Sequence, residues 1–301
     1  MDSQTAAPPP AASGTRIRLD IAYDGTAFSG WARQRGLRTV QGEIEGALAV
    51  LLRRHPPAPR LIVAGRTDAG VHATGQVAHL DLTEEQAAAL SRHRQGSKKP
   101  VQGAEALARR INGILGLDSD IVIRRSSLAA EGFDARFSPV WRRYEYRVGD
   151  ASVARNPLVR HNTVWYPAAL DEARMNDAAA ELLGLHDFAA YCRPPQAGAT
   201  TVRTLQEFSW RRDPDGVLIA TVQADAFCHS MVRSLVGACV SAGQGALSVE
   251  RVGGILAERA RVSEFKVMPA KGLTLLEVGY PADEELAARA EQTRARREPL
   301  D

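Results

Sequence analysis

The segment from Ala64 to Ala73 holds the residues whose types and spacing best suit chemistry on a bound ligand. It places one carboxylate, Asp68, between glycines at 65 and 70, with Arg66 two residues before it. Glycine allows backbone angles and close approaches that other residues do not, and the apolar run Leu61–Val63 predicts a buried strand leading into this loop. A carboxylate presented in this way can act as a nucleophile. An Asx-type turn, in which Asp68 only binds nearby backbone N–H groups, explains the same ten residues equally well.

Five segments in the same order carry a family resemblance. Gly65–His72 resembles the catalytic loop of the tRNA pseudouridine synthase A family. The four further matches are Tyr23–Thr26 with Gly30–Gln34, Phe133–Ser138 with Arg142–Tyr146, Ala226–Arg233 with Val236–Gly237, and Gly272–Leu275. Because they run from about Ile17 to Tyr280 in register, chance is a poor explanation.

The resemblance implies an isomerase that turns uridine into pseudouridine at positions thirty-eight to forty, in the anticodon arm of tRNA, without a cofactor. It maps the family's catalytic aspartate onto Asp68 and implies a homodimer with the tRNA bound across both subunits. A base stacked in a stem hides its C6 and C1′ atoms, so we expect the uridine to be flipped out. The residues do not distinguish attack on C6 from attack on C1′.

A nucleophilic aspartate in an apolar pocket needs a nearby cation to stay charged. Arg233 is the expected ion-pair partner of Asp68, although on its own it also fits the exposed side of an amphipathic helix. Arg66 is expected to face the RNA, where it can hold a phosphate or fill the gap left by the flipped base.

Alternation along Arg142–Val148 predicts a strand with Tyr144, Tyr146 and Val148 on one face. The family's substrate-contacting tyrosine aligns with Tyr144, whose ring suits stacking on uracil and whose hydroxyl suits proton removal at C5. A core position is the other interpretation of Tyr144, and Tyr146 is expected in the core. The remaining expected substrate-binding residues are His72, Phe227, His229, Arg142 and Arg143; no metal site is expected.

The chain has 301 residues and a net charge of +3, with only four lysines among 38 basic residues. Abundant arginine suits phosphate recognition, but a GC-rich genome also produces it. Three cysteines without metal-type spacing predict free thiols. Without a signal peptide or a long apolar run, we expect a cytoplasmic protein that does not enter membranes.

Strand and helix patterns predict an α+β fold. Expected strands cover 16–23, 60–64, 76–82, 121–129, 141–148, 202–211, 216–224 and 272–280, and expected helices cover 40–55, 104–115, 171–185, 229–242 and 249–258. The resemblance implies two ferredoxin-like subdomains, 16–140 and 141–282, whose antiparallel sheets meet at a central cleft. Residues 1–15 are expected to be a disordered leader and 283–301 a charged tail.

The chain departs from the family pattern at Ser91–Gln102, an added basic loop, and at Gly116–Ser119. These departures affect the docking of tRNA rather than the chemistry. The alternatives to the enzyme are a non-catalytic RNA-binding or tRNA-chaperone module on the same fold and a carboxylate-using riboside hydrolase. The hydrolase needs a second acid as proton donor, which no motif supplies.

Overall fold

The computed structural model describes residues 14–91, 103–194, 200–258 and 260–294. Most of the expected leader and nearly all of the expected basic loop lie outside these ranges. The strands are β1 (Thr15–Tyr23), β2 (Ile62–Val63), β3 (His72–Leu82), β4 (Ile121–Leu128), β5 (Trp141–Gly149), β6 (Val164–Trp165), β7 (Gly184–Asp187), β8 (Val202–Arg212), β9 (Leu218–Ala224) and β10 (Leu273–Gly279). The helices are α1 (Val40–Leu51), α2 (Glu84–Ser91), α3 (Gly103–Leu115), α4 (Glu172–Ala180), α5 (Met231–Gly243), α6 (Val249–Gly254) and α7 (Leu286–Arg294).

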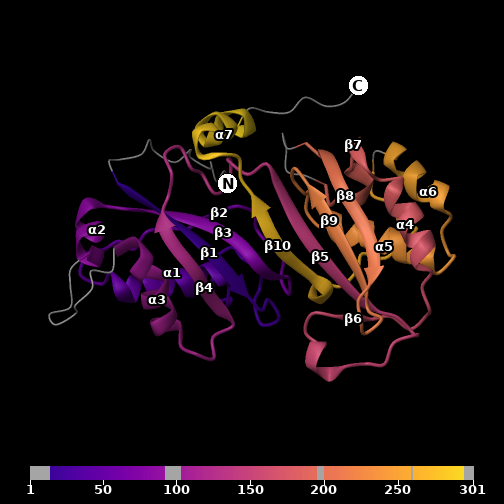
Figure 1. Ribbon diagram of the computed structural model, residues 1–301, viewed down its shortest axis with the longest axis horizontal. Coiled ribbons are helices and arrows are strands. Elements are labelled where there is room, and N and C mark those ends of the chain that lie inside the picture. Colours follow the sequence, from indigo (N-terminus) through magenta and orange to yellow (C-terminus); the bar gives the residue numbers. More distant parts are fainter. Residues whose placement is uncertain (1–13, 92–102, 195–199, 259, 295–301) are drawn as a thin grey trace.

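The strands form one mostly antiparallel sheet in the order β4-β1-β3-β10-β5-β9-β8-β7, with β2 paired to β3 and β6 to β5. The predicted α+β class is therefore confirmed, but the two expected sheets are one continuous sheet. The strand β10 causes this difference, because it pairs antiparallel with β5 and parallel with β3. Figure 1 shows α1–α3 beside the N-terminal strands and α4–α6 beside the C-terminal strands, with β10 and β5 in the middle.

Local sequence explains the elements that border the site. In β1, Ile17, Leu19 and Ile21 alternate with polar residues and are buried, as period-two patterning requires. The helix α1 begins after Thr39, whose hydroxyl accepts a hydrogen bond from Gly42 N at 3.2 Å, a normal N-cap. These buried faces fix the strands and helix that surround the loop before β3.

The described part of the expected charged tail is an ordered helix. Figure 1 shows the helix α7 in yellow above the upper ends of the strands, near the middle of the sheet. Its Leu286 is buried and its carbonyl accepts from the Ser138 hydroxyl at 3.1 Å, while Arg294 pairs with Asp134 at 3.0 Å. The helix α7 therefore packs against the connection between the two halves.

None of the helices within the described ranges has the length and apolar character needed to cross a membrane. The three cysteines are free thiols, as expected. Across the same residues, no cluster of His, Cys, Asp or Glu side chains has an arrangement that could hold a metal ion.

Candidate active site

Residues 64–71, the Asp68 loop, join β2 to β3 where the two halves of the sheet meet. Val71 N donates to Asp68 O at 3.2 Å and closes a turn, with Gly70 at φ +79°. The expected need for glycine is thus confirmed at 70. The same expectation is wrong at Gly65, where φ is not in the left-handed region and a Cβ would meet open space. The close approach occurs instead at Gly30, where a Cβ would lie 2.9 Å from Thr67 O.

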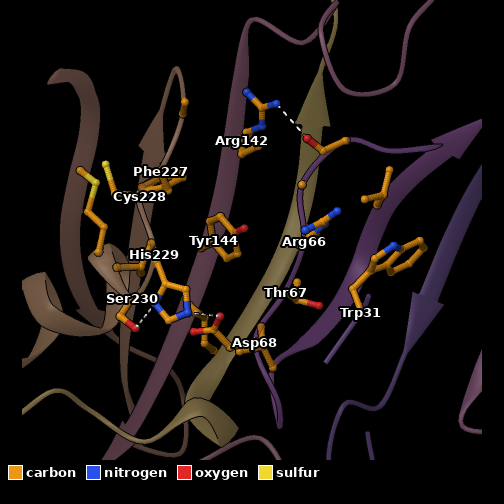
Figure 2. Close-up of a pocket in the computed structure, with 18 of the residues that line it drawn as sticks. Trp31, Arg66, Thr67, Asp68, Arg142, Tyr144, Phe227, Cys228, His229 and Ser230 are labelled. Carbon is orange, nitrogen blue, oxygen red and sulfur yellow. Dashed lines mark hydrogen bonds and ion pairs between the residues drawn. The ribbon is translucent and has the colours of Figure 1, made fainter. Parts of the chain in front are cut away.

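The Asp68 carboxylate points across the cavity to the other half of the chain (Figure 2). Its Oδ2 accepts from Arg233 Nη2 at 3.2 Å, and its Oδ1 lies 3.5 Å from His229 Nε2. The Asp68 side chain is 31% exposed and that of Arg233 is 18% exposed. The Asx-turn interpretation is therefore wrong, because this carboxylate contacts Arg233 and His229, which are distant in sequence, rather than the backbone of its own loop.

Ser230 connects Arg233 and His229, a role that sequence reasoning missed. Its Oγ accepts from Arg233 Nη2 at 3.0 Å and lies 3.0 Å from His229 Nδ1. Ser230 has φ +64°, the one positive value among non-glycine residues of the described chain. Residues other than glycine rarely adopt this left-handed backbone conformation, and where they do, it often marks a functional site. The bend lets His229 and Arg233, on either side of the start of α5, reach the same carboxylate.

Tyr144 projects from β5 into the same cavity, as Figure 2 shows. Its ring packs edge to face on Phe227, with centroids 5.1 Å apart and planes at 89°. Burial raises the pKa of Tyr144 to about 12, with Arg142 opposing the rise and Asp68 adding to it. The phenol is therefore neutral near pH 7, where it can donate a hydrogen bond but cannot act as a phenolate base.

Arg142 lines the cavity but is committed to main-chain carbonyls. Its guanidinium donates to Asp225 O at 2.7 Å, Ala64 O at 3.0 Å and Arg136 O at 3.4 Å. Burial lowers the pKa of Arg142. Because Ala64 begins the Asp68 loop, Arg142 ties that loop to β5, and its expected contact with RNA stays a prediction.

Arg143 is not brought to the cavity. It lies on the sheet face opposite Tyr144, as alternation along β5 predicts. There it donates to Gln223 at 2.9 Å and to Glu277 at 3.1 Å. Arg143 therefore pairs with polar side chains on that face of the sheet and does not line the cavity.

His72 is also outside the cavity, buried just beyond the Asp68 loop. Its Nε2 lies 2.9 Å from His161 O and 3.1 Å from Lys271 O. Carbonyl oxygens only accept, so Nε2 carries a hydrogen, and Nδ1 accepts from Gly25 N at 3.0 Å. His72 therefore joins three segments behind the loop.

The cavity has a volume of about 520 Å³ and draws its lining from both halves of the chain, including Asp68, Tyr144, Phe227, His229 and Arg233. This volume is typical of small-ligand sites. Arg66 is exposed at its edge and has no hydrogen-bond or ion-pair partner among the described residues. An unpaired guanidinium beside a paired carboxylate suits an anionic ligand such as a nucleic acid.

Comparison with known proteins agrees with this chemistry. Residues 178–281 match the family described as tRNA pseudouridine synthase. Curated proteins named tRNA pseudouridine synthase A are similar over nearly the whole chain. That of Leifsonia xyli is 60% identical, covering 94% of this chain and 98% of its own length. That of Streptomyces avermitilis is 50% identical, covering 94% of both. A solved Cbf5-Nop10-Gar1 complex aligns with a TM-score of 0.32 at 10% identity, covering 88% of this chain and 60% of its own, which is too low to bear on the fold.

Proposed function

The chain belongs to the tRNA pseudouridine synthase A family, and we propose that it isomerises uridines at positions thirty-eight to forty of tRNA with Asp68 as the nucleophile. The observation that carries the proposal is the position of Asp68, which faces the cavity between Arg233 and His229 with the Tyr144 ring beside it. A carboxylate, a cation that keeps it charged and an aromatic ring are the parts that this isomerisation uses.

The reaction breaks the bond from ribose C1′ to uracil N1, turns the base and joins C1′ to C5. C5 loses a proton and N1 gains one, so there is no net redox change and no molecule leaves. Asp68 can add to C6 or attack C1′, and on either route the carboxylate is released unchanged. The Arg233 guanidinium stabilises its negative charge through the ion pair.

Tyr144 and Arg66 act on the substrate in this proposal. The Tyr144 ring gives the flipped uracil an aromatic surface. Since the Tyr144 phenol is neutral, it can take the proton from C5 only while it passes its own hydrogen to another acceptor. Arg66 faces the RNA, in agreement with its exposure and with the lack of a hydrogen-bond or ion-pair partner among the residues that the structure describes.

The finer architecture is also part of the proposal. Residues 16–140 and 141–282 each contribute neighbouring strands with helices packed on them, which supports two related ferredoxin-like subdomains sharing one sheet. The family resemblance supports a homodimer that binds tRNA through both subunits. Sedimentation of the protein with and without tRNA measures that stoichiometry.

Incubation with unmodified tRNA transcripts and mapping of pseudouridine tests the function. We expect product at positions thirty-eight to forty and none when those uridines are replaced by cytidine. Asp68→Asn should bind tRNA like the parent and form no product, because it removes the nucleophile with little change in shape. Asp215→Asn, at an exposed position that does not line the cavity, is the charge-matched control. Substantial product from Asp68→Asn would exclude the nucleophile, and tRNA binding by an inactive parent would favour the non-catalytic RNA-binding module.

A further inference from the structure

The Asp68 loop rests on a set of buried polar side chains that the reaction itself does not use. Tyr23 from β1 is 5% exposed, Gln76 from β3 is 0% exposed, and Thr67 in the loop is 7% exposed. They lie among apolar neighbours such as Ile21 and Ala78. Polar groups in such surroundings are retained at a cost in solvation, so their hydrogen bonds need an explanation.

Hydrogen bonds link these side chains to one another and to the loop. Gln76 Nε2 can only donate, and it donates to Gly65 O at 2.9 Å and to the Tyr23 hydroxyl at 3.2 Å. The Tyr23 hydroxyl lies 2.8 Å from Thr67 Oγ1, and either hydroxyl can donate in that bond. Burial raises the pKa of Tyr23, so its hydroxyl stays protonated at working pH. Gln76 Oε1 accepts from Val77 N at 3.2 Å, which fixes the amide orientation.

These bonds fix the loop on both sides of Arg66 and directly before Asp68. The bond from Gln76 holds the carbonyl of Gly65, and the bond with Tyr23 holds the side chain of Thr67. Trp31 N also donates to Thr67 O, at 3.0 Å. The backbone that carries Arg66 and Asp68 is therefore held at neighbouring peptides, while the Arg66 side chain has no hydrogen-bond or ion-pair partner within the described ranges.

We propose that Tyr23, Gln76 and Thr67 are positioning residues that aim Asp68 and Arg66 at the substrate. The inference rests on the proposed role of Asp68. Without the chain of hydrogen bonds, the loop would keep its ion pair with Arg233 but would lose the constraint on its direction. Reaction rates depend steeply on such placement: about 1 Å of error costs roughly a hundredfold. The hydrogen bonds among Tyr23, Gln76 and Thr67 therefore affect the chemical step more than the binding of tRNA.

The test compares Tyr23→Phe and Thr67→Val with the control Tyr191→Phe. Tyr191 is also fully buried and its hydroxyl also makes a hydrogen bond, to Val252 O at 2.7 Å, but it lies in the C-terminal half outside the cavity. Each variant is measured for single-turnover pseudouridine formation, tRNA affinity and thermal unfolding. We expect Tyr23→Phe and Thr67→Val to slow the reaction about tenfold with affinity within about twofold of the parent. Thr67→Ser should restore most of the rate, and Tyr191→Phe should react within about twofold of the parent.

The double variant adds a second criterion. Because Tyr23 and Thr67 act through one bond, Tyr23→Phe with Thr67→Val should react no more than about twofold slower than either single variant. Parent-like rates for both single variants would overturn the inference, as would equal slowing by Tyr191→Phe. If one single variant does not fold, the other decides. Asp68→Asn in the same assay separates the two proposals: its activity would contradict the nucleophile, whereas its inactivity beside a fully active Tyr23→Phe would contradict only the positioning chain.

Discussion

Substitutions at Ser230 should affect the stability of the fold and the rate of the reaction in different ways. Its left-handed backbone and its hydroxyl can be changed separately. Ser230→Ala removes the hydroxyl and keeps the backbone strain. Ser230→Gly removes the hydroxyl and also relieves the strain, because glycine adopts positive φ at no steric cost. The two variants therefore share the same lost side-chain contacts and differ in their backbone energy.

The expected magnitudes follow from these two contributions. A left-handed conformation costs an L-residue about 1–2 kcal/mol, and a typical hydrogen bond contributes about 0.5–1.5 kcal/mol net. Ser230→Ala should lower the free energy of unfolding by about 1–2 kcal/mol, since the bonds to Arg233 and His229 are lost. Ser230→Gly should stay within about 1 kcal/mol of the parent. Both should slow pseudouridine formation about tenfold, because Arg233 and His229 lose their common anchor beside Asp68.

Urea unfolding gives the free energies, and single-turnover assays on a tRNA transcript give the rates. The rates of the two variants should agree with each other although their stabilities differ. A parent-like rate for Ser230→Gly would show that the hydroxyl bridge has no part in the reaction. Equal unfolding free energies for the Gly and Ala variants would contradict the assignment of backbone strain to Ser230.

Two further predictions concern neighbouring parts of the molecule. Tyr144→Phe should bind tRNA normally but react about a hundredfold more slowly, whereas Tyr146→Phe, which loses a buried bond to a main-chain carbonyl, should react within about twofold of the parent; equal rates for Tyr144→Phe and the parent would leave Tyr144 a packing role. Burial alone would raise the pKa of Asp150, but hydrogen bonds from Arg212 and Ser152 outweigh it and hold that pKa well below its usual range. A depressed folded-state pKa stabilises the fold above the unfolded value of about 3.9, and this stabilisation is lost as the pH falls toward the folded value. Asp150→Asn should therefore cost about 1–3 kcal/mol at pH 7 and less at pH 3, which urea unfolding at both values measures; a constant difference would contradict the linkage.

The fold could be predicted wherever one face of an element is apolar. Period-two alternation located β1 and β5, and the cap at Thr39 located α1. The helix α2 was missed because it is weakly amphipathic, although Thr83 and Gln86 form reciprocal backbone contacts at 3.2 Å that a capping-box pattern anticipates. The strand β7 was merged into the preceding helix, and Gly184, at φ +106°, is the signal that should have separated them.

The geometry of the site was less accessible from sequence. A motif could single out Asp68, Arg233 and Tyr144, but it could not show that Arg142 binds carbonyls or that His72 is buried behind the loop. Both outcomes depend on which main-chain groups the fold leaves nearby, and sequence patterns do not encode that. The strain at Ser230 had no sequence signal, since serine is common before a helix for a different reason, as an N-cap.

The site lies where β10 joins the two halves of the sheet, between β3 and β5. This position explains why no local sequence pattern could reveal its geometry. The strand β10 pairs with β3 through only two residue pairs, so the strand ladder alone gives little constraint there. Arg142, which reaches from β5 to Ala64 O, supplies the missing constraint from the C-terminal half. Asp68 then meets Arg233, which is 165 positions away in the sequence. Asp68 and Arg233 are therefore brought together only when both halves are folded and joined, so the ion pair that the proposed reaction needs depends on the contact between the two halves of the sheet.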